Sequence, residues 1–230
     1  MEDKIRELPI LFNTKMVQAI LDGRKTCTRR LVKFLPGENP QWTGYIKDKL
    51  MLYNGKNEPC IRKVPYQVGD VLYVRETWQC WRAHRYEATA DIKFRAGGDD
   101  VRLQFANGNT DSINRLDYDT FVHKWFSYNS KWKPSLFMPK EAARIWLKVI
   151  DVRLERLQEI TNDGCVAEGV YASNCRRRNA TFGCDTGIDE GYSEIDEFTE
   201  IWNSTIKKPD LDRYGWDANP WVWVIEFKRI

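Results

Sequence analysis

The chain has 230 residues, 42% hydrophobic and 30% charged, a balance that excludes a disordered chain and a fibrous repeat. Its 36 lysines and arginines against 33 acidic residues leave a formal charge of +3, too small for nucleic-acid binding through bulk charge. A local basic cleft stays open, because the field depends on where the charges cluster.

The first predicted element is a short helix near the N-terminus. Asn13 or Thr14 can cap it, apolar residues follow at helical spacing, and Gly23 suits the position where the chain leaves the helix. Residues 24–30 contain β-branched side chains and no apolar stripe, so we expect a loop or the start of a strand there.

The middle of the chain is predicted to be mostly β. Apolar and aromatic alternation indicates strands at residues 45–53 and 70–78. Residues 80–135 are polar and aromatic and contain the turn signals Gly97-Gly98 and Asn107-Gly108. We expect this segment to be an insertion with one or two hairpins.

The second half alternates between strand and helix signals. Residues 142–157 predict a long strand of a curved sheet or barrel, and a short helix is expected to begin at Thr161. A basic loop over 171–192 precedes a helix at 193–204. The final strand, 221–227, is apolar on both faces and belongs in the middle of a structure. Together these elements predict an α+β fold with a mainly antiparallel β core.

Ten tryptophans are many for a chain of this size, and several stand among polar residues. Most large aromatic side chains fill cores, and the others can form faces on which a planar ring stacks. The tryptophans in polar surroundings are Trp42, Trp78, Trp81, Trp125 and Trp132.

The N-terminal residues and the lack of a long apolar stretch predict a cytoplasmic protein. The N-terminal residues do not resemble a secretory signal, and the longest apolar stretch, broken by Lys148, is too short for a membrane span. We therefore expect no membrane partner and reduced thiols. A zinc site from Cys165, Cys175 and Cys184 is weaker than isolated thiols, because structural zinc prefers closer spacings.

Known catalytic motifs are few. The sequence contains no Walker loop, no G-x-G-x-x-G and no H-E-x-x-H, and its two histidines, His84 and His123, both lie within 80–135. A histidine triad or a zinc–histidine hydrolase is disfavoured. If the protein is an enzyme, we expect a lysine or a carboxylate as its base.

The segment Gly23-Arg24-Lys25-Thr26-Cys27-Thr28-Arg29-Arg30 matches the G-x-K-x-x-x-x-R signature of the ASCH family, which has a PUA-like fold. Further blocks resemble the family in order: 68–72, the junction 157–161, Glu168-Gly169 and 224–228. Residues 75–78, 138–140 and 219–223 resemble the longer ASCH proteins of phages and prophages.

The resemblance implies a single domain over 1–230 with insertions at 80–135 and 171–192. It implies a PUA-like, mainly antiparallel β-barrel with flanking helices and an inserted hairpin-rich segment. It also implies the cytoplasm of a bacterial host or of a phage-infected cell.

One bacterial branch of the family consists of N4-acetylcytidine amidohydrolases, and its catalytic residue types are present in this chain. The resemblance implies Thr28 as nucleophile, Lys25 as the acceptor of its proton and Glu168 as the proton donor to the leaving N4 amine. No metal or cofactor is implied. The substrate is then a modified cytidine, as a nucleoside or in RNA.

The chemistry of this set requires an unusual lysine. A lysine accepts a proton from threonine only if its pKa falls from about 10.4 to about 7–8, a shift worth roughly 4 kcal/mol. Burial and the neighbouring arginines lower the pKa of Lys25, whereas an ionised Glu168 raises it. A neutral lysine beside a protonated glutamate suits the base and acid roles. The alternative is an ordinary Lys25–Glu168 ion pair that braces the barrel.

Further residues are candidate contacts to substrate or nucleic acid. Each also has a structural interpretation: an Arg-Glu pair at a strand end for Arg75, or a barrel plug for Trp78. The basic run 176–178 suggests an extended nucleic-acid contact, although it also fits a solvated loop. The candidate contacts are Gly23, Arg24, Arg29, Arg30, Arg75, Trp78, Lys140 and Arg144.

Three functions follow from these residues. The first is hydrolysis of the N4-acyl amide of a modified cytidine. The second is a binding module that recognises RNA or a modified base without chemistry, and its affinity falls steeply with salt. The third is a ribonuclease, because some relatives in the family are described as such and a Lys/Glu pair suits acid–base catalysis of phosphodiester transesterification.

Overall fold

A computed structural model describes residues 5–33, 40–46, 49–60, 64–105, 117–126, 131–170 and 193–230. They form a mixed α+β fold, with most strands in antiparallel pairs and a few short helices. The chain divides into two compact units. The first unit holds Met1–Asp22, Asp70–Lys148 and Arg229–Ile230, and the second holds Gly23–Gly69 and Val149–Lys228.

The first unit begins with a parallel strand pair. Strand β1 (Glu7–Leu11), which was not predicted, pairs parallel with β5 (Val71–Arg75). The first residues of β9 (Trp146–Arg156) pair antiparallel with β5. Helix α1 (Thr14–Leu21) follows β1 and confirms the predicted helix, because the side chain of Asn13 accepts a hydrogen bond from the third residue on.

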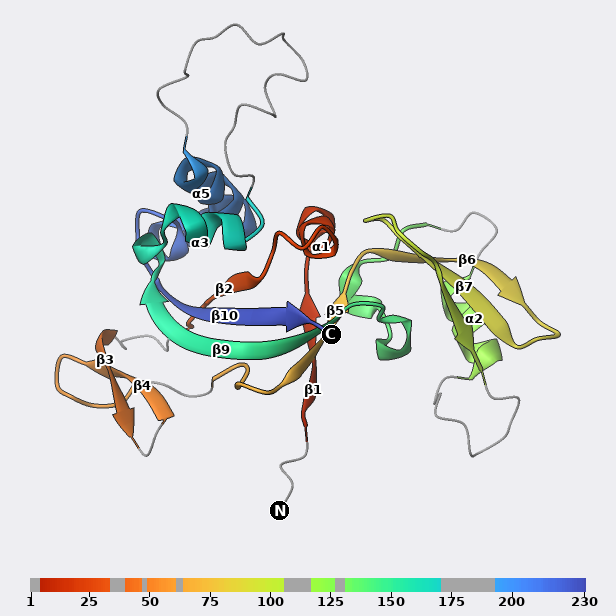
Figure 1. Cartoon of the computed structure of the whole chain (residues 1–230), viewed down its shortest axis with the longest axis horizontal. Helices are drawn as coiled ribbons and strands as arrows, with labels where there is room; N and C mark the ends of the chain where they lie inside the picture. The colour runs from red at the N-terminus through yellow and green to blue at the C-terminus, as the bar shows by residue number, and fades with distance from the viewer. Residues whose placement is uncertain are drawn as a thin grey trace, which may run out of the picture. The chain divides into compact units, whose positions relative to one another are not determined.

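The predicted insertion contains a three-stranded antiparallel sheet of β6 (Trp78–His84), β7 (Thr89–Phe94) and β8 (Val101–Gln104). This confirms the hairpin prediction, and Gly97 and Gly98 turn the chain between β7 and β8 with φ of +82° each. Helix α2 (Tyr118–Trp125), which was not predicted, lies against the sheet (Figure 1). Its Phe121 packs into the core that Trp78, Ile92 and Phe94 form.

Two single turns of 3-10 helix complete the first unit, η1 (Ser135–Phe137) and η2 (Lys140–Ala142). The predicted strand over 70–78 is wrong in its length, because β5 ends at Arg75 and β6 begins at Trp78. Between them the buried carboxylate of Glu76 bonds the guanidinium of Arg144 at 2.9 and 3.0 Å, an interaction that sequence alternation does not encode.

The second unit continues strand β9 and adds β10 (Trp221–Arg229) and β2 (Cys27–Leu31), in the order β9-β10-β2. Strand β10 is buried along most of its length, as predicted for a strand that is apolar on both faces. Strand β9 confirms the predicted long strand over its central part, and the turn η3 (Leu157–Glu159) follows it. Strand β2 stands at the end of this order.

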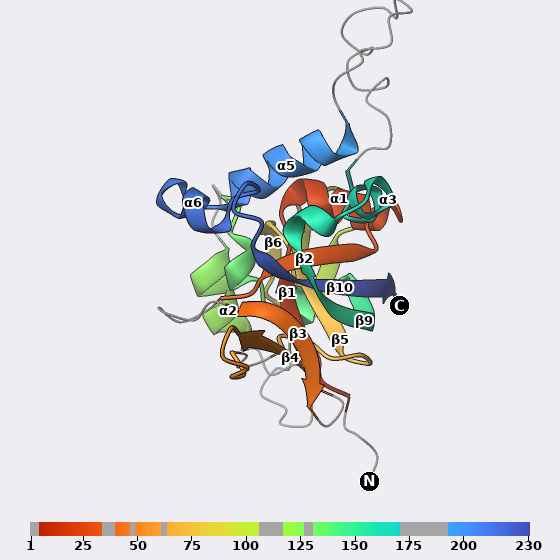
Figure 2. The same cartoon turned by 90° about the vertical axis from the view of Figure 1, so that its left-hand side faces the viewer.

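Helices cover one face of β2 and β10 (Figures 1 and 2). They are α3 (Asn162–Ala167) and α5 (Glu194–Thr205), with η4 (Lys208–Asp210) and α6 (Leu211–Tyr214) after them. Both predicted helices are confirmed, because Thr161 and Ser193 cap α3 and α5 through their side chains. Phe198 and Trp202 of α5 pack with Cys27, Leu157 and Val222 in the core of this unit. The predicted basic loop, 171–192, lies outside the described residues.

The second unit also contains the hairpin of β3 (Pro40–Ile46) and β4 (Lys49–Asn54). The single strand predicted over 45–53 is therefore wrong. The prediction did not include the strand Pro40–Ile46 with which β4 pairs. In this hairpin the ring of Trp42 stacks on Tyr53 with centroids 4.2 Å apart.

Candidate functional site

The C-terminal end of helix α3 places Glu168. Glu168 is the C-terminal cap, and Gly169 follows with φ of +95°, a conformation that glycine adopts at low cost. The amide of Gly169 donates to the Val166 carbonyl at 2.8 Å, and the amide of Val170 donates to the Cys165 carbonyl at 3.1 Å. These two bonds form a Schellman motif, which fixes the backbone at Glu168 although α3 contains the poor helix former Gly164.

The signature segment is bonded to this helix end through backbone and side-chain atoms. The guanidinium of Arg24 donates to the Gly169 carbonyl at 2.9 Å, and the amide of Thr26 donates to the Ala167 carbonyl at 2.9 Å. Helix ends leave carbonyls without intrahelical partners, and cations near a C-terminus stabilise them. The signature therefore satisfies the end of α3 while β2 begins beside it.

Lys25 and Glu168 form a buried ion pair at the centre of this arrangement. The Lys25 Nζ donates to Glu168 Oε2 at 2.7 Å, to the Glu168 carbonyl at 2.8 Å and to the Cys27 carbonyl at 2.7 Å. The two side chains are 1% and 7% exposed. Residues 143 positions apart in the sequence are thus brought into contact, and three acceptors surround the three donors of the ammonium.

Arg29 joins the pair from strand β2. Its guanidinium lies 3.4 Å from Glu168 Oε1 and 3.2 Å from Glu155 Oε2 on β9, and its Nε has no hydrogen-bond partner among the described residues. Sequence analysis missed Glu155. The alternation of Asp151, Arg153 and Glu155 along one face of a strand was the signal that pointed to a charged cluster there.

The electrostatics lower the pKa of Lys25. Burial is the largest cause, because it disfavours the charged amine, and the charge of Arg30 acts in the same direction. The carboxylate of Glu168 opposes both effects. The pKa of Arg30 is lowered too, mainly by burial. A lowered lysine pKa is the direction that general-base chemistry requires.

Two thiols near the pair are inert. Burial raises the pKa of Cys27 to about 12 and that of Cys165 to about 11, so both stay protonated at neutral pH. Among the cysteines within the described ranges, Cys27, Cys60, Cys80 and Cys165 are free and buried.

Thr28 lies on β2 beside the pair. Strand alternation directs Thr28 and Arg30 to the face opposite Cys27 and Arg29. Thr28 is buried, and its side chain makes no hydrogen bond to any described residue, Lys25 and Glu168 included.

The other predicted contacts of the signature have structural partners. Gly23 has φ of +75° and turns the chain out of α1, as predicted. Arg24 bonds the end of α3, and Arg29 bonds the acidic side chains of Glu168 and Glu155. These partners favour a positioning role for both arginines.

The remaining predicted contacts lie in the first unit. Trp78 is fully buried in the core of that unit, which favours the role of a core side chain. Lys140 pairs with Glu7, and Arg144 makes a bidentate pair with the buried carboxylate of Glu76. Arg75 donates to the Leu136 carbonyl at 3.2 Å.

A metal centre finds no support within the described residues, where no three histidine, cysteine, aspartate or glutamate side chains converge. The two histidines differ in setting: His84 contacts Asp91 at 2.9 Å, and His123 lies in α2. None of the helices that the structure describes is both long and apolar enough to cross a membrane.

Comparison of the chain with protein-family models, with curated proteins and with solved structures gives no match to any of them. The ASCH resemblance therefore rests on the signature at 23–30 and the sequence blocks that follow it, and the chemistry of the site follows from its own geometry.

Proposed function

We propose that this chain is an ASCH-type hydrolase that cleaves the N4-acyl amide of a modified cytidine, as a nucleoside or within RNA. The observation that carries the proposal is the buried contact of 2.7 Å between Lys25 Nζ and Glu168 Oε2, combined with the lowered pKa of Lys25. The PUA-like barrel and a cytoplasmic setting in a bacterial or phage-infected cell belong to the same proposal, and the sequence blocks support them.

The reactive form of the pair is neutral. Transfer of the ammonium proton along the hydrogen bond to the Glu168 carboxylate leaves an amine and a carboxylic acid. Burial lowers the free-energy cost of this transfer, because charged groups lose more solvation than neutral ones. The amine then serves as the base and the acid as the proton donor, with the two roles separated by environment.

The reaction then proceeds through the threonine. The Lys25 amine takes the proton of the Thr28 hydroxyl while Oγ attacks the acyl carbonyl carbon. The C–N bond breaks, Glu168 gives its proton to N4 of the leaving cytosine, and an acyl ester remains on Thr28. Water hydrolyses the ester to the free acid, and the proton on Lys25 returns to Glu168.

Substrate binding has to bring Thr28 to the pair. Lys25 holds the Cys27 carbonyl at 2.7 Å, and release of this bond frees the amine for the hydroxyl of the next residue. The Cys27 carbonyl and Thr28 both lie at the start of β2, where alternation directs the Thr28 side chain to the face opposite Arg29. The backbone at this strand end therefore has to rotate to turn Oγ toward Nζ. Hydrogen bonds of catalytic groups commonly tighten on substrate binding.

The test is release of cytidine from N4-acetylcytidine by the full chain, supplied as the nucleoside and within a short RNA. Thr28→Val, Lys25→Gln and Glu168→Gln each reduce the rate by about 100- to 10,000-fold. Thr26→Val is the matched control, because Thr26 is two residues away with an exposed side chain. Turnover by Thr28→Val or Lys25→Gln at the wild-type rate contradicts the nucleophile and base roles of these two residues.

A second function is favoured by one observation: all three ammonium protons of Lys25 are bonded in the described structure. A lysine whose three donors are all bonded suits a domain that binds RNA or a modified base without chemistry. In such a domain the ion pair stabilises the structure of the binding edge. Salt-dependent RNA binding that Lys25→Gln weakens, by a wild-type chain that releases no cytidine, assigns this function instead.

A further inference from the structure

The three-stranded sheet of the first unit has one core face and one outer face. Trp78, Cys80 and Ile92 point into the core that α2 covers. A β-bulge interrupts the pairing of β6 with β7 between Cys80 and Arg82. A bulge sets two residues opposite one, and in this sheet it presents Trp81 and Arg82 together on the outer face.

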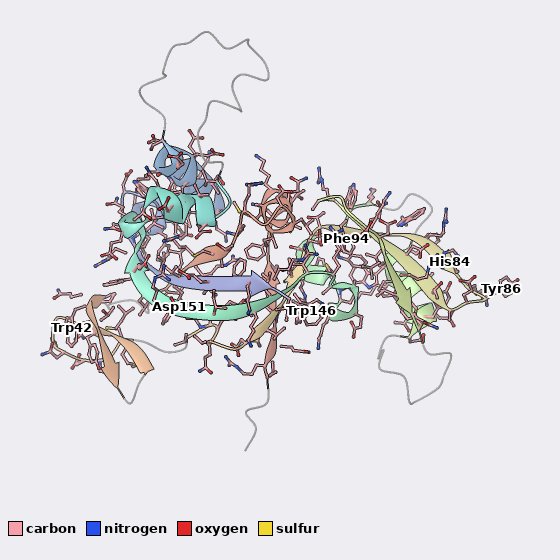
Figure 3. All side chains as sticks on the ribbon, viewed as in Figure 1. Trp42, His84, Tyr86, Phe94, Trp146 and Asp151 are labelled. Carbon is pink, nitrogen blue, oxygen red and sulfur yellow. The ribbon has the colours of Figure 1, made fainter. Side chains whose placement is uncertain are left out.

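A second tryptophan joins this face from a neighbouring segment. Lys133 forms an isolated bridge with Trp78, whose side chain points into the core, and so Trp132 is directed to the outer face by alternation. Lys93 of β7 confirms this, because its Nζ lies 5.7 Å from the ring centroid of Trp81 and 5.8 Å from that of Trp132. Together Trp81, Arg82, Lys93 and Trp132 form what we call the Trp–Lys face. It lies on the sheet whose ends Figure 3 marks with His84 and Tyr86 at one end and Phe94 at the other.

Within the described parts of the chain, the cations of the Trp–Lys face have aromatic partners and no acidic ones. The guanidinium carbon of Arg82 stands 4.4 Å from the centroid of Trp81, and neither Arg82 nor Lys93 makes an ion pair with a described residue. The acid on this face, Asp91, is occupied by Arg102 at 2.7 Å and by His84 at 2.9 Å. Two positive charges thus remain for an external anion.

The ring of Trp132 is open to a ligand, because this side chain is 40% exposed. Trp81 is only partly exposed, and its indole Nε1 is buried with no hydrogen-bond partner among the described residues. Trp81 therefore supports the guanidinium of Arg82, which lies over its ring, and Trp132 is the ring on which a base can stack.

We infer that the Trp–Lys face binds single-stranded RNA, with an unpaired base stacked on Trp132 and phosphates held by Lys93 and Arg82. An exposed ring beside cations that have no acidic partner among the described residues matches a polymer that alternates flat bases with phosphates. A duplex hides its base faces, so it does not fit. The inference does not rest on the proposed hydrolase, because it involves no residue of the Lys25–Glu168 pair.

The test is fluorescence anisotropy of the full chain with labelled oligouridine and oligoadenosine of about twelve nucleotides, at several salt concentrations. We expect both oligomers to bind. Trp132→Ala weakens binding by about fivefold to 150-fold, the range that loss of one stacked base produces. Trp132→Phe keeps most of the affinity, since it retains a ring. Lys93→Gln reduces the slope of log K against log salt by about 0.7, the value for one phosphate contact on a single strand.

Matched controls come from outside the face. Trp42→Ala removes a tryptophan that is 42% exposed in the other unit, and Lys148→Gln removes an exposed lysine of β9. Both bind as the wild type does. The inference is overturned if the wild type binds neither oligomer, if it binds an RNA duplex as tightly, or if Trp132→Ala and Lys93→Gln are both unchanged. Binding of polyglutamate in place of RNA also overturns it and assigns the face to an acidic protein. These oligomers carry no acyl group. The binding results can therefore be interpreted in the same way if the hydrolase proposal fails.

Discussion

Replacement of Lys25 by methionine tests the energetics of the buried pair. The variant keeps a side chain of similar length but removes the charge and the donors to Glu168 and to two backbone carbonyls. Glu168 then keeps one long contact of 3.4 Å to Arg29. Removing one partner of a buried ion pair costs about 3–5 kcal/mol, and the remaining arginine places the expected loss near the lower value.

The assay is urea unfolding followed by tryptophan fluorescence. At a slope of about 2 kcal/mol/M, a loss of about 3–5 kcal/mol lowers the midpoint by about 1.5–2.5 M. The double variant Lys25→Met/Glu168→Gln loses less than the sum of the two single variants, because no unpaired charge stays buried. Lys148→Met, at an exposed position of β9, stays within about 0.5 kcal/mol of the wild type. A loss below about 1 kcal/mol for Lys25→Met is the value of an exposed pair and refutes the reasoning.

Three further predictions concern charge and burial. Burial lowers the pKa of Lys25 below its ordinary 10.5. The contribution of this group to the unfolding free energy is therefore fully present above pH 10.5, and it is lost as the pH falls toward the pKa of the folded state. The unfolding free energy of the wild type therefore rises with pH below 10.5 more steeply than that of Lys25→Met, and equal slopes contradict this. Burial raises the pKa of Cys27 and of Cys80 to about 12. Iodoacetamide at about pH 8 therefore leaves both thiols unmodified in the folded chain and labels both in urea. Peptide mapping that finds either thiol labelled in native buffer contradicts their burial. Arg144→Met removes the bidentate partner of Glu76, whose side chain is 1% exposed and whose pKa burial already raises, and costs about 3–5 kcal/mol at neutral pH by urea unfolding. That loss shrinks as the pH falls and the carboxyl takes up a proton, and a loss that does not depend on pH is inconsistent with a buried carboxylate.

Local sequence patterns correctly predicted those helices and strands that have a clear apolar periodicity or a capping residue. The helix capped by Asn13, the helix that follows Thr161 and the strand of residues 221–227 were all identified correctly, because each combines apolar spacing with a boundary residue. The sequence did not reveal β1, whose five residues are short and only partly buried. Helix α2 was missed as well, because its eight residues carry few apolar side chains and only Phe121 is buried.

The sequence predicted the Lys25–Glu168 pair but not the side chains that surround it. The signature and its spacing indicated Lys25 and Glu168, and the structure brings their charged atoms into contact. Arg29 was expected at a substrate, and the structure instead shows it bonded to Glu168 and to Glu155. Such pairings depend on which strands are neighbours, and a single sequence does not determine neighbours. The position of Thr28 relative to Lys25 depends on strand twist at the start of β2, which is also a tertiary property.

The pair connects fold and chemistry in one place. The same bonds that hold the signature to the end of α3 also desolvate the Lys25 amine, and desolvation is the main cause of its lowered pKa. An interaction that weakens this anchoring also lets water reach the amine and restores an ordinary pKa. Variants at Arg24, which bonds the adjacent Gly169 carbonyl, are expected to act in this indirect way.

The most direct measurement is an NMR titration of the lysine side chains in the full chain, with Lys25 assigned by its absence in Lys25→Met. A neutral amine at this position gives one lysine that loses its proton well below 10.5, and Glu168→Leu lowers that midpoint further because it removes the opposing carboxylate. A Lys25 that titrates at 10.5 or above would leave the chain without its base and reduce the pair to a structural brace.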